Sequence, residues 1–108
     1  MSASVTLLVP IEISDIHVLV QGCSLVEADN VVYRFLRVNF ENLRATKVSP
    51  ILVPLDELEL LLVNHALNAA LRVAIDEDVF TALKTVDPVG RKFAAALTVL
   101  RALEVTRV

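Results

Sequence analysis

Residues 50–73 read PILVPLDELELLLVNHALNAALRV and contain the change of hydrophobic pattern that decides the fold. Before Pro50, apolar residues tend to alternate along the chain, which is the period of a β-strand. After Pro54, apolar residues recur at spacings of three and four, which is the period of an α-helix. The sequence therefore predicts a sheet in the first half of the chain and helices in the second half.

The predicted fold class is α+β. A chain of 108 residues is long enough for one hydrophobic core and too short for two. No internal repeat and no linker are visible in the sequence. We therefore expect a single domain over residues 1–108, in which an antiparallel sheet over 4–53 packs against two or three helices over 55–103.

The clearest predicted strand covers residues 31–43. Its even-numbered positions form the expected core face and carry Val32, Leu36, Val38 and Phe40. The opposite face carries Tyr33, Phe35 and Arg37, which are residue types enriched in the cores of protein interfaces. Further upstream, the alternation changes phase at Ser14 and Asp15, which predicts a β-bulge. We expect Tyr33, Phe35 and Arg37 to form part of an interface.

The first predicted helix follows Pro54 and is apolar around most of its circumference. Such a helix is buried on more than one side, so it is either the central helix of the domain or part of a subunit interface. Its candidate interface residues are Leu60, Leu67 and Leu71.

One narrow polar stripe runs along the same helix and is the best candidate for a binding site. The stripe consists of Asn64, His65, Asn68 and Arg72, with Asn64, Asn68 and Arg72 at spacings of four. Such a group suits an anion or a polar ligand, with Arg72 as the charged anchor. The alternative is that the stripe is only the solvated edge of an amphipathic helix.

Two further helices are predicted after the first. The acidic run at residues 76–78 opens a short one, whose expected inner face is Val79, Phe80, Leu83 and Val86. Asp87 and Pro88 then give a start signal for the last helix. A helix-turn-helix reading places Arg91 and Lys92 near the start of a DNA-reading helix, although the acidic run opposes contact with phosphates.

The composition is unusually apolar for a small domain. Hydrophobic residues make up 56% of the chain, whereas ordinary domains contain roughly 45–50% even when Gly is counted. The longest stretch without a charged residue, 60–71, is shorter than the about 20 residues of a membrane-spanning helix. No basic region of the kind found in signal peptides opens the chain. We expect an aqueous compartment, most simply the cytoplasm, and partners that cover the surplus apolar surface.

The chemically reactive residues form no complete motif. Cys23 is the only cysteine, which excludes an intrachain disulfide, and its pairing with His17 or His65 as a nucleophile has no support from spacing. Asp15 and His17 share a face if the segment is a strand, but two ligands do not make a metal site. We therefore expect no catalytic residue, no metal and no cofactor.

The sequence leads to one functional hypothesis and two alternatives. The first is a non-enzymatic, oligomer-forming or assembly protein that acts through apolar interfaces with itself or with a larger complex. A nucleic-acid-binding regulator or antitoxin-like module, acting through Arg91 and Lys92, is the first alternative. A net charge of −3 makes nucleic acid an unlikely partner, because non-specific binding depends on neutralising phosphates. The second alternative is a small-ligand-binding or enzymatic domain that uses His65, Asn68 and Arg72.

Overall fold

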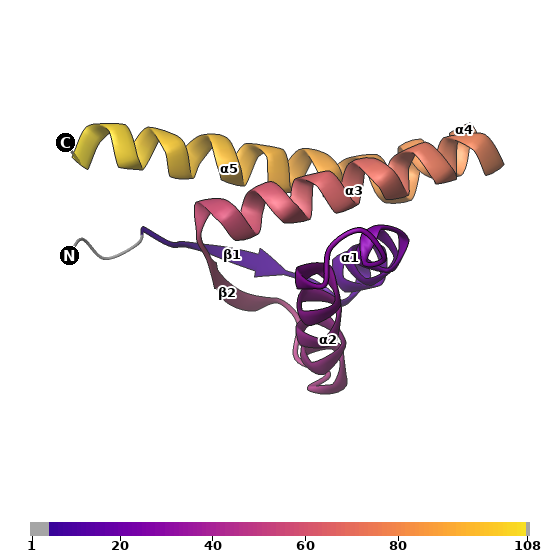
Figure 1. Cartoon of the computed structure of the whole chain (residues 1–108), viewed down its shortest axis with the longest axis horizontal. Coiled ribbons are helices and arrows are strands. Elements are labelled where there is room, and N and C mark those ends of the chain that lie inside the picture. The colour runs from indigo at the N-terminus through magenta and orange to yellow at the C-terminus, as the bar shows by residue number, and fades with distance from the viewer. Residues whose placement is uncertain (1–4, 108) are drawn as a thin grey trace.

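The computed structural model describes residues 5–107 as two short strands and several helices. In chain order the elements are β1 (Leu7–Ile11), α1 (Ile13–Val26), α2 (Val32–Ala45), β2 (Ile51–Leu55), α3 (Glu57–Glu77), α4 (Val79–Thr81), the π-helical segment η1 (Ala82–Val86) and α5 (Asp87–Arg107). Helices α3 and α5 run side by side along the longest axis, and the strands, α1 and α2 lie on one side of this hairpin (Figure 1).

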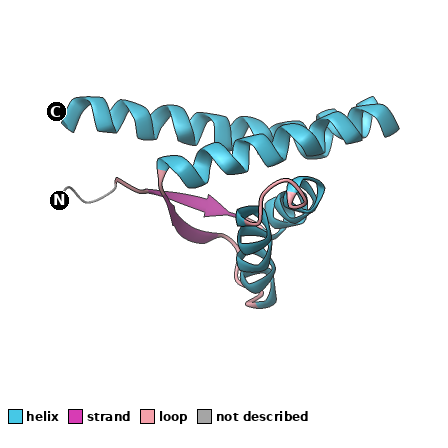
Figure 2. Cartoon of the chain, in the orientation of Figure 1, coloured by secondary structure: helices cyan, strands magenta, loops and turns pink. Residues whose placement is uncertain are grey.

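The predicted α+β class with an antiparallel sheet is confirmed. Strands β1 and β2 pair in antiparallel fashion, with Val9 opposite Val53. The predicted helices of the second half are present as α3 and α5. The predicted extent of the sheet, 4–53, is wrong: Figure 2 shows helices between the two strands, where α1 and α2 occupy most of residues 13–45. Residue 4 lies outside the described part of the chain.

Helix α2 occupies the segment that was predicted as the clearest strand. Its buried residues are Tyr33, Leu36 and Phe40, at spacings of three and four. The strand prediction depended on Leu36 and Phe40, but a spacing of four fits a helix as well as a strand. In a helix, residues two apart point in different directions, so Phe35 does not share the face that carries Tyr33 and Arg37, which are four residues apart.

Helix α1 explains the change of phase that was interpreted as a bulge. Its buried positions, among them Ile16, Leu19 and Cys23, again recur at spacings of three and four. At the start of the helix, the side chain of Asp15 accepts a hydrogen bond of 3.0 Å from the backbone amide of Glu12. The predicted bulge at Ser14 and Asp15 is therefore wrong, because the helix begins at Ile13 and its first turn includes both residues.

The two halves of the chain are copies of one β-α-α unit, so the expectation of no internal repeat is wrong. Residues 8–10 and 52–54 both read Leu-Val-Pro, and a shift of 44 positions (53 minus 9) places Val9 on Val53. These two valines are also opposite each other in the ribbon. The same shift places Asp15 on Glu59, and each accepts the backbone amide three residues before it.

The repeat gives the molecule an approximate two-fold arrangement. The shift of 44 that relates Val9 to Val53 also relates Gly22 to Ala66 (66 minus 22). Helices α1 and α3 cross where Gly22 meets the backbone of Ala66, so equivalent positions touch each other. The units differ in their ends, because α2 has 14 residues whereas α5 has 21.

Helix α3 is the central element of the core. It packs against α1 on one side and against α5 on the other, with Leu60, Val63 and Leu67 buried. Within residues 5–107, it is the one helix that is long and apolar enough to cross a membrane. Its contacts with α1 and α5 bury Leu60, Val63, Ala66, Leu67 and Ala70, and 28% of its apolar window is buried.

Between α3 and α5, the short helix α4 and the segment η1 continue into α5 without a break. Asp78 caps α4 by accepting the amide of Phe80 at 3.1 Å. Pro88 has no amide hydrogen, and its ring conflicts with the carbonyl four residues earlier, so the preceding turn widens into the π-helix η1. Asp87 has helical dihedral angles and does not cap the last helix as predicted.

The predicted inner face of the short helix is largely wrong. Val86 is buried, but Val79, Phe80 and Leu83 are exposed by 45%, 76% and 54%. Helix α4, which contains Val79 and Phe80, lies at the end of the α3–α5 hairpin (Figure 1). The segment that carries these residues is helical, as predicted, but no element of the described chain covers their side chains.

Candidate functional site

The polar stripe of α3 divides into one structural residue and three surface residues. Asn64 donates from Nδ2 to the backbone oxygen of Leu60 at 2.8 Å and to that of Phe93 at 3.1 Å. It therefore joins α3 to α5, and its amide hydrogens are used within the fold. The other three members are exposed: His65, Asn68 and Arg72. The ring of His65 lies 6.1 Å from the ring of Tyr33, centroid to centroid.

The predicted interface residues fall on both the inside and the outside of the chain. Tyr33, Leu60 and Leu67 are buried in its own core, and Leu71 is half-buried. Arg37 is held by two carboxylates, with Nε 2.8 Å from Glu27 and Nη1 3.1 Å from Glu41. Only Phe35, 64% exposed, presents a large apolar side chain to a partner.

The two residues proposed for nucleic-acid contact both lie in ion pairs. Arg91 Nε is 2.7 Å from Asp87 Oδ2, one turn earlier on α5. Lys92 Nζ is 2.5 Å from Asp15 Oδ2 and joins α5 to the start of α1. Each cation therefore has a carboxylate partner within the protein.

The two paired strands are a second element that could contact nucleic acid. A two-stranded antiparallel ribbon is one of the elements that enter the major groove of DNA, where hydrogen-bonding side chains read base edges. The outward face of β1 and β2 carries Leu8, Pro10, Leu52 and Pro54. None of these four side chains donates or accepts a hydrogen bond, so this face is apolar and unsuited to reading bases.

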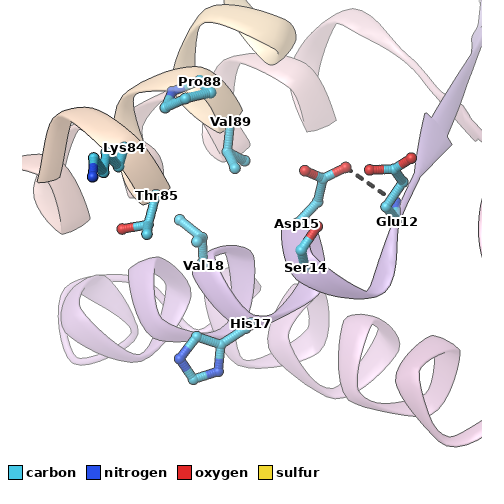
Figure 3. A pocket seen from close by; sticks show the side chains of 9 residues that line it. All are labelled: Glu12, Ser14, Asp15, His17, Val18, Lys84, Thr85, Pro88 and Val89. Carbon is cyan, nitrogen blue, oxygen red and sulfur yellow. Dashed lines mark hydrogen bonds between the residues drawn. The ribbon is translucent and has the colours of Figure 1, made fainter. Parts of the chain in front are cut away.

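An open cleft of about 500 Å³ lies between the start of α1 and the segment from η1 to α5. Figure 3 shows Asp15 and Glu12 at one end of the cleft and Lys84, Thr85 and Pro88 across from α1. His17 points away from Asp15, because positions two apart on a helix face different directions. The acid-base pair considered from the sequence is therefore not formed.

The carboxylate of Asp15 in this cleft is bound by other groups of the protein. Asp15 is 7% exposed, and its carboxylate accepts hydrogen bonds from the amide of Glu12 and from Lys92. Within residues 5–107, no group of three or more His, Cys, Asp or Glu side chains is placed to hold a metal ion. The cleft thus contains a largely buried ion pair, between Asp15 and Lys92, that joins α1 to α5.

Cys23 is enclosed in the core and is not a nucleophile. Its side chain has no exposed surface, and burial raises the pKa of Cys23 to about 12. The thiolate is the reactive form of cysteine, so Cys23 is unreactive near neutral pH. Cys23 behaves as a small apolar core residue.

The raised pKa of Cys23 predicts a loss of stability at alkaline pH. The thiol titrates near 9 when unfolded and near 12 when folded, so unfolding releases a proton between these values. The contribution is fully present below pH 9 and decreases as pH rises, by about 1.4 kcal/mol at pH 10. Urea unfolding at several pH values checks this for wild type and Cys23→Ala. Parallel curves for the two proteins between pH 8 and pH 10 would contradict it.

Three exposed apolar surfaces are the main chemical feature of the outside of the molecule. The ribbon face consists of Leu8, Pro10, Leu52 and Pro54. The α2 face consists of Val31, Phe35 and Val38, exposed by 57%, 64% and 41%. The hairpin tip consists of Ile75, Val79, Phe80 and Leu83. Large apolar side chains gathered in this way mark sites of interaction, whereas scattered ones do not.

The sequence analysis identified Phe35 but missed the surfaces themselves. Val31, Phe35 and Val38 follow the helical spacing of four and three, which was a usable signal once the segment was known to be a helix. The ribbon face and the hairpin tip had no such signal, because their exposure depends on which neighbours cover them.

Comparison with known proteins adds no assignment. No family model, no curated protein and no solved structure matches this chain.

Proposed function

We propose that the protein is a non-enzymatic assembly protein that associates through its exposed apolar surfaces, with a second copy of itself as the primary partner. The observation that supports this is the gathering of large apolar side chains on the ribbon face, the α2 face and the hairpin tip. Phe80 alone is 76% exposed, and Leu52 on the ribbon face is 60% exposed. Leaving such groups in water costs free energy that a partner surface recovers.

The composition and the fold support an aqueous compartment, and we propose the cytoplasm. The apolar surfaces are separated by charged side chains, including the acidic run at residues 76–78. Anionic lipid surfaces attract basic segments rather than acidic ones. A protein partner therefore suits the hairpin tip better than a membrane.

The ribbon favours association through its face rather than by adding strands at its edges. Pro10 and Pro54 have no amide hydrogen, and Pro10 lies opposite Leu52 in the pairing. Proline on an edge strand removes a donor that an added strand needs. The two prolines thus limit sheet extension and leave the apolar face as the adhesive part of the ribbon.

The test is the mass of the full chain in solution. We expect light scattering after size exclusion to give a mass above the 11.8 kDa of one protomer, rising with concentration. The variant Ser24→Asp, at an exposed polar position on α1, is a control that should behave as wild type. A folded protein that remains at the protomer mass from micromolar to millimolar concentration would contradict the proposal.

A further inference from the structure

The hairpin tip and the α2 face carry opposite charges beside their apolar residues. Between residues 75 and 86 there are three acidic side chains and one lysine, a net charge of −2 (three negative, one positive). Between residues 27 and 48 there are four basic and three acidic side chains, a net charge of +1 (four positive, three negative). Two of these acidic side chains, Glu27 and Glu41, are paired with Arg37, so the unpaired charge along α2 comes from Arg34, Arg44 and Lys47.

The negative charge of Asp78 at the tip is exposed and held in place. Asp78 at the tip accepts hydrogen bonds from the amide of Phe80 and from the hydroxyl of Thr81, at 3.1 and 2.8 Å. These bonds lower the pKa of Asp78 and keep its charge beside the exposed Phe80. The carboxylate is thus fixed at the edge of the apolar tip.

On the α2 face, Arg34 lies one turn from both Val31 and Val38. Arg34, Arg44 and Lys47 are exposed, and none forms an ion pair within the described residues 5–107. The one glutamate of the helix, Glu41, is already occupied by Arg37. The α2 face therefore presents apolar side chains with an uncompensated basic rim.

We infer that copies of this chain assemble head to tail, with the acidic hairpin tip of one protomer seated on the basic α2 face of the next. This inference rests on the proposed function and specifies its geometry. Each protomer carries both members of the complementary pair, so a second copy fulfils the chemical requirement. Symmetric pairing of two tips, or of two α2 faces, places like charges opposite each other and is disfavoured.

The geometry has consequences for the assembly. A contact between two different surfaces repeats from copy to copy and gives either a ring or an open chain, not a closed dimer. Each surface presents only three or four large apolar side chains, whereas a stable interface buries about 800 Å² per partner. Association is therefore weak, dependent on concentration and reduced by salt, because the Debye length falls to about 3 Å at 1 M.

The test uses two variants that each remove one surface. Phe80→Asp disables the tip and Phe35→Asp disables the α2 face, and both side chains are exposed, so the fold is retained. Leu58→Asp is the matched control: Leu58 is 64% exposed, as Phe35 is, and lies at the opposite end of α3 from the tip. Light scattering on a concentration series measures the mass of each protein and of an equimolar mixture of the two variants.

We expect wild type and Leu58→Asp to grow with concentration, and each of the other variants to remain a protomer. The mixture should form a complex of one copy of each variant and stop there, because one intact tip and one intact α2 face remain between them. If wild type assembles and either variant alone assembles equally well, the head-to-tail inference is wrong while the proposed function stands. A mixture that does not associate also overturns the inference. A wild type that remains a protomer overturns both.

Discussion

Replacing Gly22 with alanine is expected to destabilise the protein by about 2–3 kcal/mol, although alanine is the better helix former. A Cβ at Gly22 would lie 2.6 Å from the backbone oxygen of Ala66 and 2.9 Å from its carbonyl carbon. Backbone atoms do not move aside as a flexible side chain does. Helices α1 and α3 must therefore separate, and they are the helices that join the two repeats.

Gly90 offers a matched control for this prediction. It is the only other glycine of the chain, it also lies inside a helix, and a Cβ there would meet nothing within 4 Å. Gly90→Ala should stabilise the protein by roughly 0.5–1 kcal/mol, because alanine loses less conformational entropy in a helix. Urea denaturation measures both variants. Equal effects of the same sign would show that the close crossing of α1 and α3 is not the determining contact.

Replacing Lys92 with methionine is expected to destabilise the protein by about 3 kcal/mol. Lys92 is the cationic partner of Asp15, and the Asp15 side chain is only 10% exposed. Removal of the lysine leaves that carboxylate in the cleft with the amide of Glu12 as its remaining hydrogen-bond donor. A charge left without its counter-ion at a largely buried position is costly.

The reverse substitution should cost less, and the difference tests the explanation. Asp15→Asn leaves Lys92, whose side chain is 30% exposed and reaches solvent, so we expect a loss of about 1–2 kcal/mol. The double variant should be less destabilised than the sum of the two single variants, as for any pair of directly interacting residues. Additive losses in thermal or urea unfolding would contradict a direct interaction between the two side chains.

The sequence was a good guide where one hydrophobic period excluded the other. In α3, apolar residues occur at odd and even positions alike, so a strand was never compatible with the segment. The predicted start of the helix, near Pro54 or Leu55, lies two to three residues before the start of α3 at Glu57. The predicted polar stripe on α3 divides, because Asn64 is used in packing against α5 whereas His65, Asn68 and Arg72 are exposed.

The sequence was a poor guide where the spacing of apolar residues fits both the strand period and the helix period. In α2, Val32, Leu36 and Phe40 are four residues apart, which is an even number and nearly one helical turn. Their β-branched and aromatic neighbours favour a strand in isolation, but packing against α1 decides the outcome. The repeat is difficult to see in the sequence, because α1 and α3 share buried positions and capping residues but few identical residues.

The sequence by itself determined the α+β class, the presence of an antiparallel sheet, and the helices after Pro54, because hydrophobic period and helix-start signals are local properties. Only the tertiary structure decided that residues 13–26 and 32–45 are helical and that Asn64 faces α5. It also decided that Phe35 and Phe80 remain in water. Exposure depends on which elements come to lie beside a residue. No element of the described chain lies over the apolar surfaces through which we propose that this protein assembles.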